Sequence, residues 1–102
     1  MNFPPLSKYR MGYALFVAQQ GAKHVSAKVL KGFHGVGVVE IVSSHRGDTF
    51  RTIYTVRLAG AVYVLHAFQK KSKTGRETTR SDLDVIDMRL RDAEQIAGGE
   101  RA

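Results

Sequence analysis

The chain has 102 residues and a mass of 11.3 kDa, a length that favours one domain over residues 1–102. It contains no cysteine, which excludes disulfides, thiolate metal sites and cysteine nucleophiles. Residues 1–80 hold thirteen Lys and Arg against three acidic residues, whereas residues 81–102 hold three Arg against six. A body this basic is expected to attract polyanions, of which nucleic acid is the commonest; the alternative is that the lysines only keep the protein soluble.

Membrane and secretion signals are not found in the sequence. No apolar run approaches the roughly 18 residues of a membrane span, because Glu40 and His66 interrupt the two best candidates. The first five residues lack the basic-then-apolar order of a signal peptide. The sequence therefore predicts a cytoplasmic protein with no membrane partner.

Residues 5–20 are predicted to form an amphipathic helix. Apolar residues at spacings of three and four would form its core-facing stripe: Leu6, Tyr9, Tyr13, Phe16 and Val17. Pro5 suits the first turn and Gly21 the position just past the end. Residues 22–37, which include three clustered glycines, are expected to be an extended connection.

Three strand-like runs follow, at residues 36–43, 49–58 and 61–68, and both joints have the composition of hairpin turns. A turn at Ala59-Gly60 would place one uncharged set of side chains together: Phe50, Thr52, Tyr54, Val56, Leu58, Ala61, Tyr63, Leu65 and Ala67. The opposite face would hold a second set: Arg51, Ile53, Thr55, Arg57, Val62, Val64, His66 and Phe68. A four-residue loop at 45–48 adds Glu40 to that second face. The first set is expected to meet the helices and the second to form a site.

A second helix is predicted at residues 82–96, after a polar stretch. Its apolar stripe would consist of Leu83, Ile86, Leu90 and Ala93. Ser81 and Asp84 are expected to form its N-terminal capping pair. The chain as a whole is predicted to be an α+β domain, with an antiparallel sheet of about three strands, an N-terminal helix and a C-terminal helix.

Cationic side chains are predicted to gather on the second face and at the end of the third strand. These candidates for phosphate binding are Arg51, Arg57, Lys70, Lys71, Lys73 and Arg76. The alternative is an ordinary solvated charge run. The four histidines do not have the spacing of a metal site, so neither a metal nor another cofactor is expected.

Three further residues are candidates for chemistry or RNA contact. His66 is the side chain on this face best suited to acid–base chemistry near neutral pH, although a hydrogen-bonded structural histidine is equally common in a strand. Glu40 is either a general base or the ion-pair partner of Arg51, with the ion pair slightly favoured. Phe68 could stack on a base, although aromatic residues in strands more often belong to the core.

Several segments resemble the phage-derived, HigB-type branch of the RelE/ParE toxin superfamily. They are residues 12–21 (GYALFVAQQG), 28–33 (KVLKGF), 39–42 (VEIV), 47–56 (GDTFRTIYTV) and, most closely, 62–73 (VYVLHAFQKKSK). The resemblance covers about residues 10–95, in the family's order and spacing. It implies helices packed on one face of a twisted sheet, with the other face left for RNA.

The resemblance implies a metal-independent, ribosome-dependent mRNA endonuclease that is neutralised by a helix-turn-helix antitoxin of the HigA type. By position it points to Arg51, Tyr54, His66, Phe68, Lys70 and Lys71. The register derived above buries Tyr54 with the core, so Tyr54 is left out of the predicted site. A degenerate toxin that only binds RNA or antitoxin is an alternative, and so is a ParE-like toxin that binds gyrase.

The start of the chain departs from the family pattern. Relatives carry an opening strand and another helix before the segment that matches residues 5–20, where this sequence has four residues. Either the sheet lacks an outer strand, which would leave an edge unpaired, or the true start codon lies upstream. If Met1 is the real start, we expect a homodimer, formed by edge-to-edge pairing or through apolar surface around the first helix.

Overall fold

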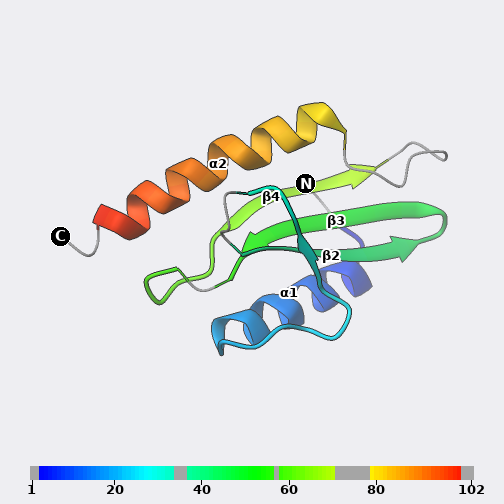
Figure 1. The fold of residues 1–102 in the computed structure, drawn as a ribbon. Coiled ribbons are helices and arrows are strands. Elements are labelled where there is room, and N and C mark those ends of the chain that lie inside the picture. Colours follow the sequence, from blue (N-terminus) through cyan, green and yellow to red (C-terminus); the bar gives the residue numbers. More distant parts are fainter. Residues whose placement is uncertain (1–2, 34–36, 57, 71–78, 100–102) are drawn as a thin grey trace.

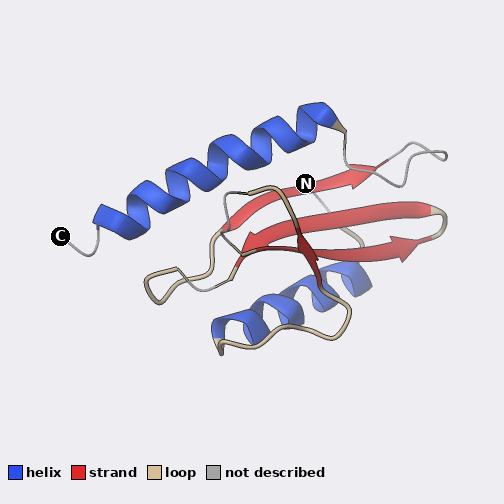
Figure 2. Cartoon of the chain, viewed as in Figure 1, coloured by secondary structure: helices blue, strands red, loops and turns tan. Residues whose placement is uncertain are grey.

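An antiparallel sheet lies between two helices in the computed structural model, which describes residues 3–33, 37–56, 58–70 and 79–99 (Figure 1, Figure 2). The helices are α1 (Pro5–Gln19) and α2 (Arg80–Gly99). The strands, in their order across the sheet, are β1 (Lys28–Leu30), β2 (Val38–His45), β3 (Asp48–Thr55) and β4 (Val64–Lys70). The α+β class predicted from the sequence is confirmed. Neither helix in the described ranges combines the length and the apolar character needed to cross a membrane.

The sheet has four strands in the described ranges, rather than about three. The additional strand, β1, lies within residues 22–37, which were expected to form only a connection, and it pairs with the start of β2. Three residues are too few to show the alternation of apolar and polar positions that identifies a strand in a sequence. Backbone pairing with β2 therefore decides this element.

Both hairpins turn through two residues whose φ angles are positive. These φ values are 50° and 85° at Arg46 and Gly47, and 50° and 86° at Ala59 and Gly60. Positive φ at both central positions matches the right-handed twist of the flanking strands. The predicted turn at Ala59-Gly60 is confirmed by the bridge from Leu58 to Ala61.

The register of β3 and β4 agrees with the prediction as far as His66 and then changes. Arg51 faces Phe68 and Ile53 faces His66, but Tyr54 faces Val64. One extra residue, Leu65, is thereby inserted into β4 as a β-bulge. Because side chains alternate along a strand, this insertion exchanges the faces of Val64, the first residue of β4, and of Tyr63 just before it.

The bulge makes part of the predicted face assignment wrong. Leu65 and Tyr63 pack on the α2 side of the sheet, not with Phe50 and Tyr54. Val62 packs on the α1 side, and Val64 lines a groove beside α1. Arg57, which was predicted to share the face of Arg51, lies outside the described residues.

The two helices cover opposite faces of the sheet, which corrects the expectation that both lie on one face (Figure 1). The α1 side buries Ile41 of β2 and Tyr54 of β3. The α2 side buries Val38 of β2 and Ile53 of β3. Since alternate residues of the central strands are apolar on both faces, each face needs its own cover.

Helix α1 occurs where it was predicted, but its buried face is a different one. The side chains in contact with the sheet are Ser7, Met11, Ala14 and Ala18. Four of the five residues of the predicted core stripe face outward: Leu6, Tyr9, Tyr13 and Phe16 are 52–76% exposed, whereas Val17 is half-buried. Small residues on the inner face let the helix lie close to the strands, whereas the bulky stripe would hold it away.

Helix α2 buries the predicted stripe through Ile86, Leu90 and Ala93. It begins two residues before the predicted position, and its cap is Thr79 rather than Ser81. The Thr79 Oγ1 accepts a hydrogen bond from the Asp82 N–H at 3.2 Å. The same hydroxyl donates to the Asp82 carboxylate at 2.8 Å, so Asp82 replaces Asp84 in the capping pair.

Candidate functional site

Charged and aromatic side chains meet on the α2 face of the sheet. Adjacent positions of β2, β3 and β4 place Glu40 opposite Ile53 and Ile53 opposite His66. The next row places Arg51 opposite Phe68. Of the predicted site residues, the structure therefore brings four together: Glu40, Arg51, His66 and Phe68.

Glu40 and Arg51 form a buried ion pair. The Arg51 Nη1 donates to the Glu40 Oε2 at 2.9 Å, and the two side chains are only 7% and 11% exposed. Their positions are diagonal neighbours on adjacent antiparallel strands, which long side chains can bridge. The ion pair favoured from the sequence is confirmed, and it fixes the position of the guanidinium.

His66 links the sheet to the start of α2. Its Nε2 lies 2.9 Å from the Asp82 Oδ1, and its Nδ1 lies 3.3 Å from the Arg89 Nη1. An arginine can only donate, so Nδ1 is the acceptor and the proton of the neutral imidazole lies on Nε2, toward Asp82. The His66 ring also stacks on Phe68, with centroids 4.7 Å apart.

The bulge supplies a second attachment for α2. The Arg89 Nη1 donates to the backbone carbonyl oxygen of Leu65, the inserted residue of β4, at 2.9 Å. Arg89 thus contacts both the bulge and the histidine beside it. Sequence reasoning missed Asp82 and Arg89 as site residues, because their acidic and basic character is also ordinary for a solvated helix face.

The structure does not describe the side chains of the remaining predicted site residues. Lys70 is the last residue of β4, opposite Thr49, and only its backbone is described. Lys71, Lys73 and Arg76 lie outside the described residues. Among the residues that are described, no three His, Asp or Glu side chains are grouped closely enough to hold a metal ion.

Tyr54 belongs to the core, as its predicted register requires. It is 1% exposed, on the α1 side of the sheet. Its Oη has no hydrogen-bond partner within the described part of the chain. Burial raises the pKa of the Tyr54 hydroxyl, since the ionised form would lose its hydration. These surroundings support its exclusion from the site.

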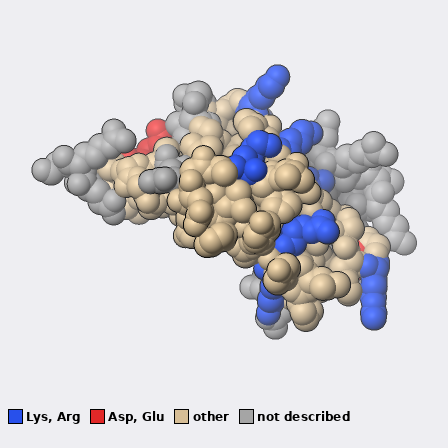
Figure 3. All heavy atoms as spheres, turned by 90° about the horizontal axis from the view of Figure 1, so that it is seen from below, with Lys and Arg blue, Asp and Glu red and all other residues tan. Residues whose placement is uncertain are grey.

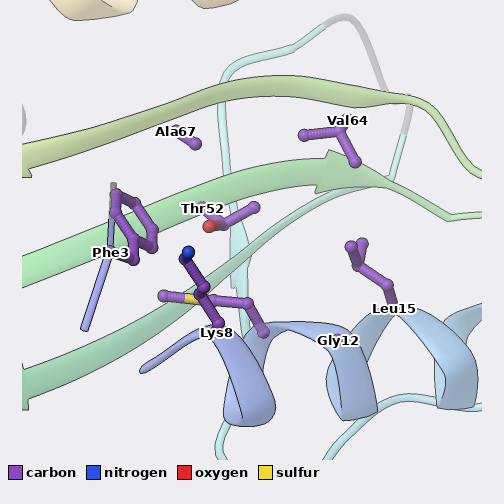
Figure 4. A pocket seen from close by; sticks show the side chains of 8 residues that line it. Phe3, Lys8, Gly12, Leu15, Thr52, Val64 and Ala67 are labelled. Atoms are coloured by element: carbon purple, nitrogen blue, oxygen red, sulfur yellow. The ribbon is translucent and has the colours of Figure 1, made fainter. Parts of the chain in front are cut away.

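The α1 side carries a separate, largely apolar hollow (Figure 4). It is an open groove of about 400 Å³ between α1 and strands β3 and β4. Its lining residues are Phe3, Lys8, Met11, Gly12, Leu15, Thr52, Val64 and Ala67. The groove contains few polar groups, so the chemistry-bearing side chains lie on the other face.

Together these features define a small basic α+β protein with charged residues concentrated on one face of its sheet. The family described as "Phage derived protein Gp49-like (DUF891)" matches residues 1–91. The chain therefore belongs to this family of phage-derived proteins, a toxin-like family of the RelE/ParE group. No curated protein and no solved structure matches the chain.

Proposed function

We propose that the protein is the toxin of a type II toxin–antitoxin system, a HigB-type endoribonuclease that cleaves mRNA on the ribosome. Its family supports the toxin role. The thirteen Lys and Arg among residues 1–80 support an RNA target, because cations that neutralise phosphates dominate binding to nucleic acids. A helix-turn-helix antitoxin is its proposed neutralising partner.

One observation carries the nuclease proposal: Arg51, His66 and Phe68 meet on one face of the sheet. A guanidinium can stabilise the charge of a phosphoryl transition state, an imidazole can transfer a proton, and an aromatic ring can stack on a base. Strand β4, which carries two of these residues, leads at Lys70 into the lysine cluster of the sequence.

In the proposed reaction, the ribose 2′-oxygen attacks the adjacent phosphorus and the bond to the 5′-oxygen of the next nucleotide breaks. The products are a 2′,3′-cyclic phosphate and a 5′-hydroxyl. The Nδ1 of His66 takes the proton of the 2′-hydroxyl, and a proton from solvent goes to the leaving 5′-oxygen. Arg51, assisted by the lysines, stabilises the added negative charge, while Glu40 positions Arg51.

This reaction requires the start of α2 to move. The Arg51 side chain is only 11% exposed, so a phosphate cannot reach it in this arrangement. The His66 Nδ1, which is the proposed proton acceptor, is already in contact with the Arg89 Nη1. Movement of α2 would separate His66 from Asp82 and Arg89 from Leu65. We propose that RNA replaces these contacts when it binds.

The same contacts favour a second candidate function, a homologue that binds RNA or antitoxin without cleaving RNA. In this alternative, Arg51 and His66 are structural residues that hold β2 and α2 to the sheet. The two functions differ in one outcome, the cleavage of transcripts.

Expression of the protein alone tests the choice. We expect the unaltered protein to arrest growth and to cause cleavage of mRNA. Cells that express the Arg51→Ala variant should grow normally. Arg91→Ala removes an exposed arginine of α2 and should remain toxic. Arg51→Ala leaves Glu40 buried without this partner, so loss of toxicity in that variant could come from unfolding. The double variant Glu40→Leu/Arg51→Leu removes both charges and should remain folded, so its loss of toxicity would report loss of catalysis. If the unaltered protein is expressed in soluble form and growth is normal with intact transcripts, the result would instead support the homologue that only binds.

The lysine cluster is tested through the salt dependence of RNA binding. Changing Lys70, Lys71 and Lys73 to Gln should lower the dependence on salt by about two to three counterions. A matched variant with Lys8, Arg10 and Lys23 changed to Gln removes equal charge from the α1 part of the chain. An equal loss of salt dependence in both variants would mean that only net charge matters.

A further inference from the structure

The outer surface of α1 carries large apolar side chains that the fold does not bury. Leu6, Tyr9, Tyr13 and Phe16, here called the α1 stripe, are 75%, 76%, 52% and 54% exposed. Beside them, in the segment after the helix, Val25 is 93% exposed. Single exposed apolar residues are normal, but a contiguous row of this size marks an interaction surface.

The stripe has the geometry of a helix-packing seam. Its residues are spaced by three, four and three, so they lie in one row over about 15 Å of helix. The row lies opposite the sheet-facing residues, which include Met11 and Ala14. Helix α1 therefore has two apolar faces, and the sheet covers one of them.

The stripe borders a hollow that contains hydrogen-bond donors. This groove has a volume of about 340 Å³ and is lined by Leu6, Tyr9, Arg10, Tyr13, His24 and Ser26. The Nδ1 of His24 accepts a hydrogen bond from the Ser26 N–H, which leaves the ring proton on Nε2. The Arg10 guanidinium is also a donor, so the polar part of the groove suits a carboxylate.

The charge around the stripe has one sign. Residues 1–27, which comprise α1 and the segments that flank it, contain three cations, Lys8, Arg10 and Lys23, and no acidic residue. Seen from the α1 side, blue Lys and Arg side chains lie above, below and to the right of an uncharged surface, and few red acidic atoms are visible, at the margins (Figure 3). An occupant of this surface should therefore be apolar in the middle and acidic at its edges.

We infer that the outer face of α1 is a docking surface for an acidic amphipathic helix of a partner protein. Apolar side chains of that helix pack between the tyrosines and Phe16, and its flanking carboxylates reach Arg10 and His24. Tyr and Arg are the residue types that dominate binding energy at such interfaces.

Two other occupants fit these observations less well. If a second copy packed its stripe against this one, Lys8 and Arg10 would lie near the same cations of the other copy, and these like charges would repel each other. Single-stranded RNA needs open ring faces, but Tyr13 already packs on Phe16 at 6.5 Å and against His24 at 5.5 Å. Leu6 and Val25 also give no stacking surface.

The docking surface lies on the opposite side of the sheet from Arg51 and His66 (Figure 1). A helix bound there leaves the candidate nuclease site uncovered. The inference therefore does not depend on the proposed RNA cleavage, and either can fail without the other.

The experiment measures binding of synthetic helical peptides of about 18 residues to the full chain. One peptide carries a leucine stripe flanked by glutamates, a second has lysines in place of the glutamates, and a third is a scrambled form of the first. We expect the acidic peptide to bind at least tenfold more tightly than either of the other two. Fluorescence anisotropy at moderate salt gives the dissociation constants.

Matched variants locate the binding. Tyr9→Ser/Tyr13→Ser should weaken binding of the acidic peptide at least tenfold. Met88→Ser/Ile96→Ser removes apolar side chains of α2 that are also more than half exposed, and it should leave binding unchanged. Arg10→Glu should weaken the acidic peptide and strengthen the lysine peptide. Circular dichroism checks that each variant remains folded.

Three results would overturn the inference. The first is equal binding of the acidic and basic peptides, or binding unchanged by the stripe variant. The second is a dimer in sedimentation equilibrium that Tyr9→Ser/Tyr13→Ser dissociates, which would assign the stripe to a second copy. The third is binding of a single-stranded RNA of about twelve nucleotides that the same variant abolishes.

Discussion

The two faces of the sheet are built from alternate residues of the same strands, yet they are held by different interactions. On the α1 face, apolar side chains are buried around Ile41 and Tyr54. Among the described residues, one side-chain hydrogen bond joins the strands to α1 on this face, between the Ser7 and Ser43 hydroxyls at 2.9 Å. On the α2 face, apolar residues alternate with the pairs Glu40–Arg51 and His66–Asp82.

This difference shows which face is specialised beyond packing. Burial is non-directional, so the α1 face tolerates changes that conserve volume. Buried charges require their partners, because removal of one partner leaves the other without compensation. The α2 face is therefore the one on which single polar substitutions should have the largest effects.

The largest effect is expected for Glu40→Leu. Loss of the carboxylate removes the buried ion pair with Arg51, and the free energy of unfolding should fall by about 3–5 kcal/mol. Glu40→Leu/Arg51→Leu should recover most of this loss. Urea unfolding measures both. Ser43→Ala on the α1 face is the comparison, with an expected loss of about 1 kcal/mol, and equal losses on the two faces would contradict the distinction.

An intermediate effect is expected for His66→Phe, which retains an aromatic ring to stack on Phe68 but loses the hydrogen bond to Asp82. The loss should be about 1–2 kcal/mol. Faster amide hydrogen exchange should be confined to the first turns of α2. Met88→Ala, at an exposed position of the same helix, should leave exchange there unchanged. Uniformly faster exchange across the molecule would argue against a local role in holding α2.

The smallest effect at neutral pH is expected for Tyr54→Phe. The Oη is buried without a hydrogen-bond partner in the described residues, so its removal should change the free energy of unfolding by less than about 1 kcal/mol. The difference should emerge in alkali. The unfolded chain releases the tyrosine proton near the ordinary pKa of 10.0, whereas burial raises the pKa in the folded state.

The stabilising contribution of the neutral Tyr54 is therefore complete below pH 10.0 and is lost as pH rises through the raised pKa. Tyr54→Phe should flatten this alkaline decline in stability. Tyr13→Phe, at an exposed position, should retain the decline. Equal pH dependence in the two variants would show that Tyr54 does not cause it.

Local signals in the sequence were enough for most elements of the fold and for part of the site. Turn chemistry at Ala59-Gly60 placed the hairpin, and residue spacing placed Ile86 and Leu90 of α2 in the core. Alternation along the strands brought Arg51, His66 and Phe68 to one face. These features depend on interactions within one element or between neighbours in the chain.

The remaining features depend on contacts between distant segments. Nothing in the composition of β4 marks Leu65 as an inserted residue, yet the insertion moves Tyr63 and Leu65 to the other face. The contact of His66 with Asp82 needs α2 to cross the sheet on that face. Periodicity alone could not choose between the two apolar faces of α1.

The sequence by itself determined the α+β class, the basic charge, the main helices and strands, and the face that carries Arg51 and His66. Tertiary structure alone decided that the helices lie on opposite faces, that His66 contacts Asp82, and that the α1 stripe is exposed. The physical reason is that periodicity reports which side chains share a face. Which face is buried depends on how closely two surfaces can approach, and the small side chains of Ser7, Ala14 and Ala18 give the closer packing.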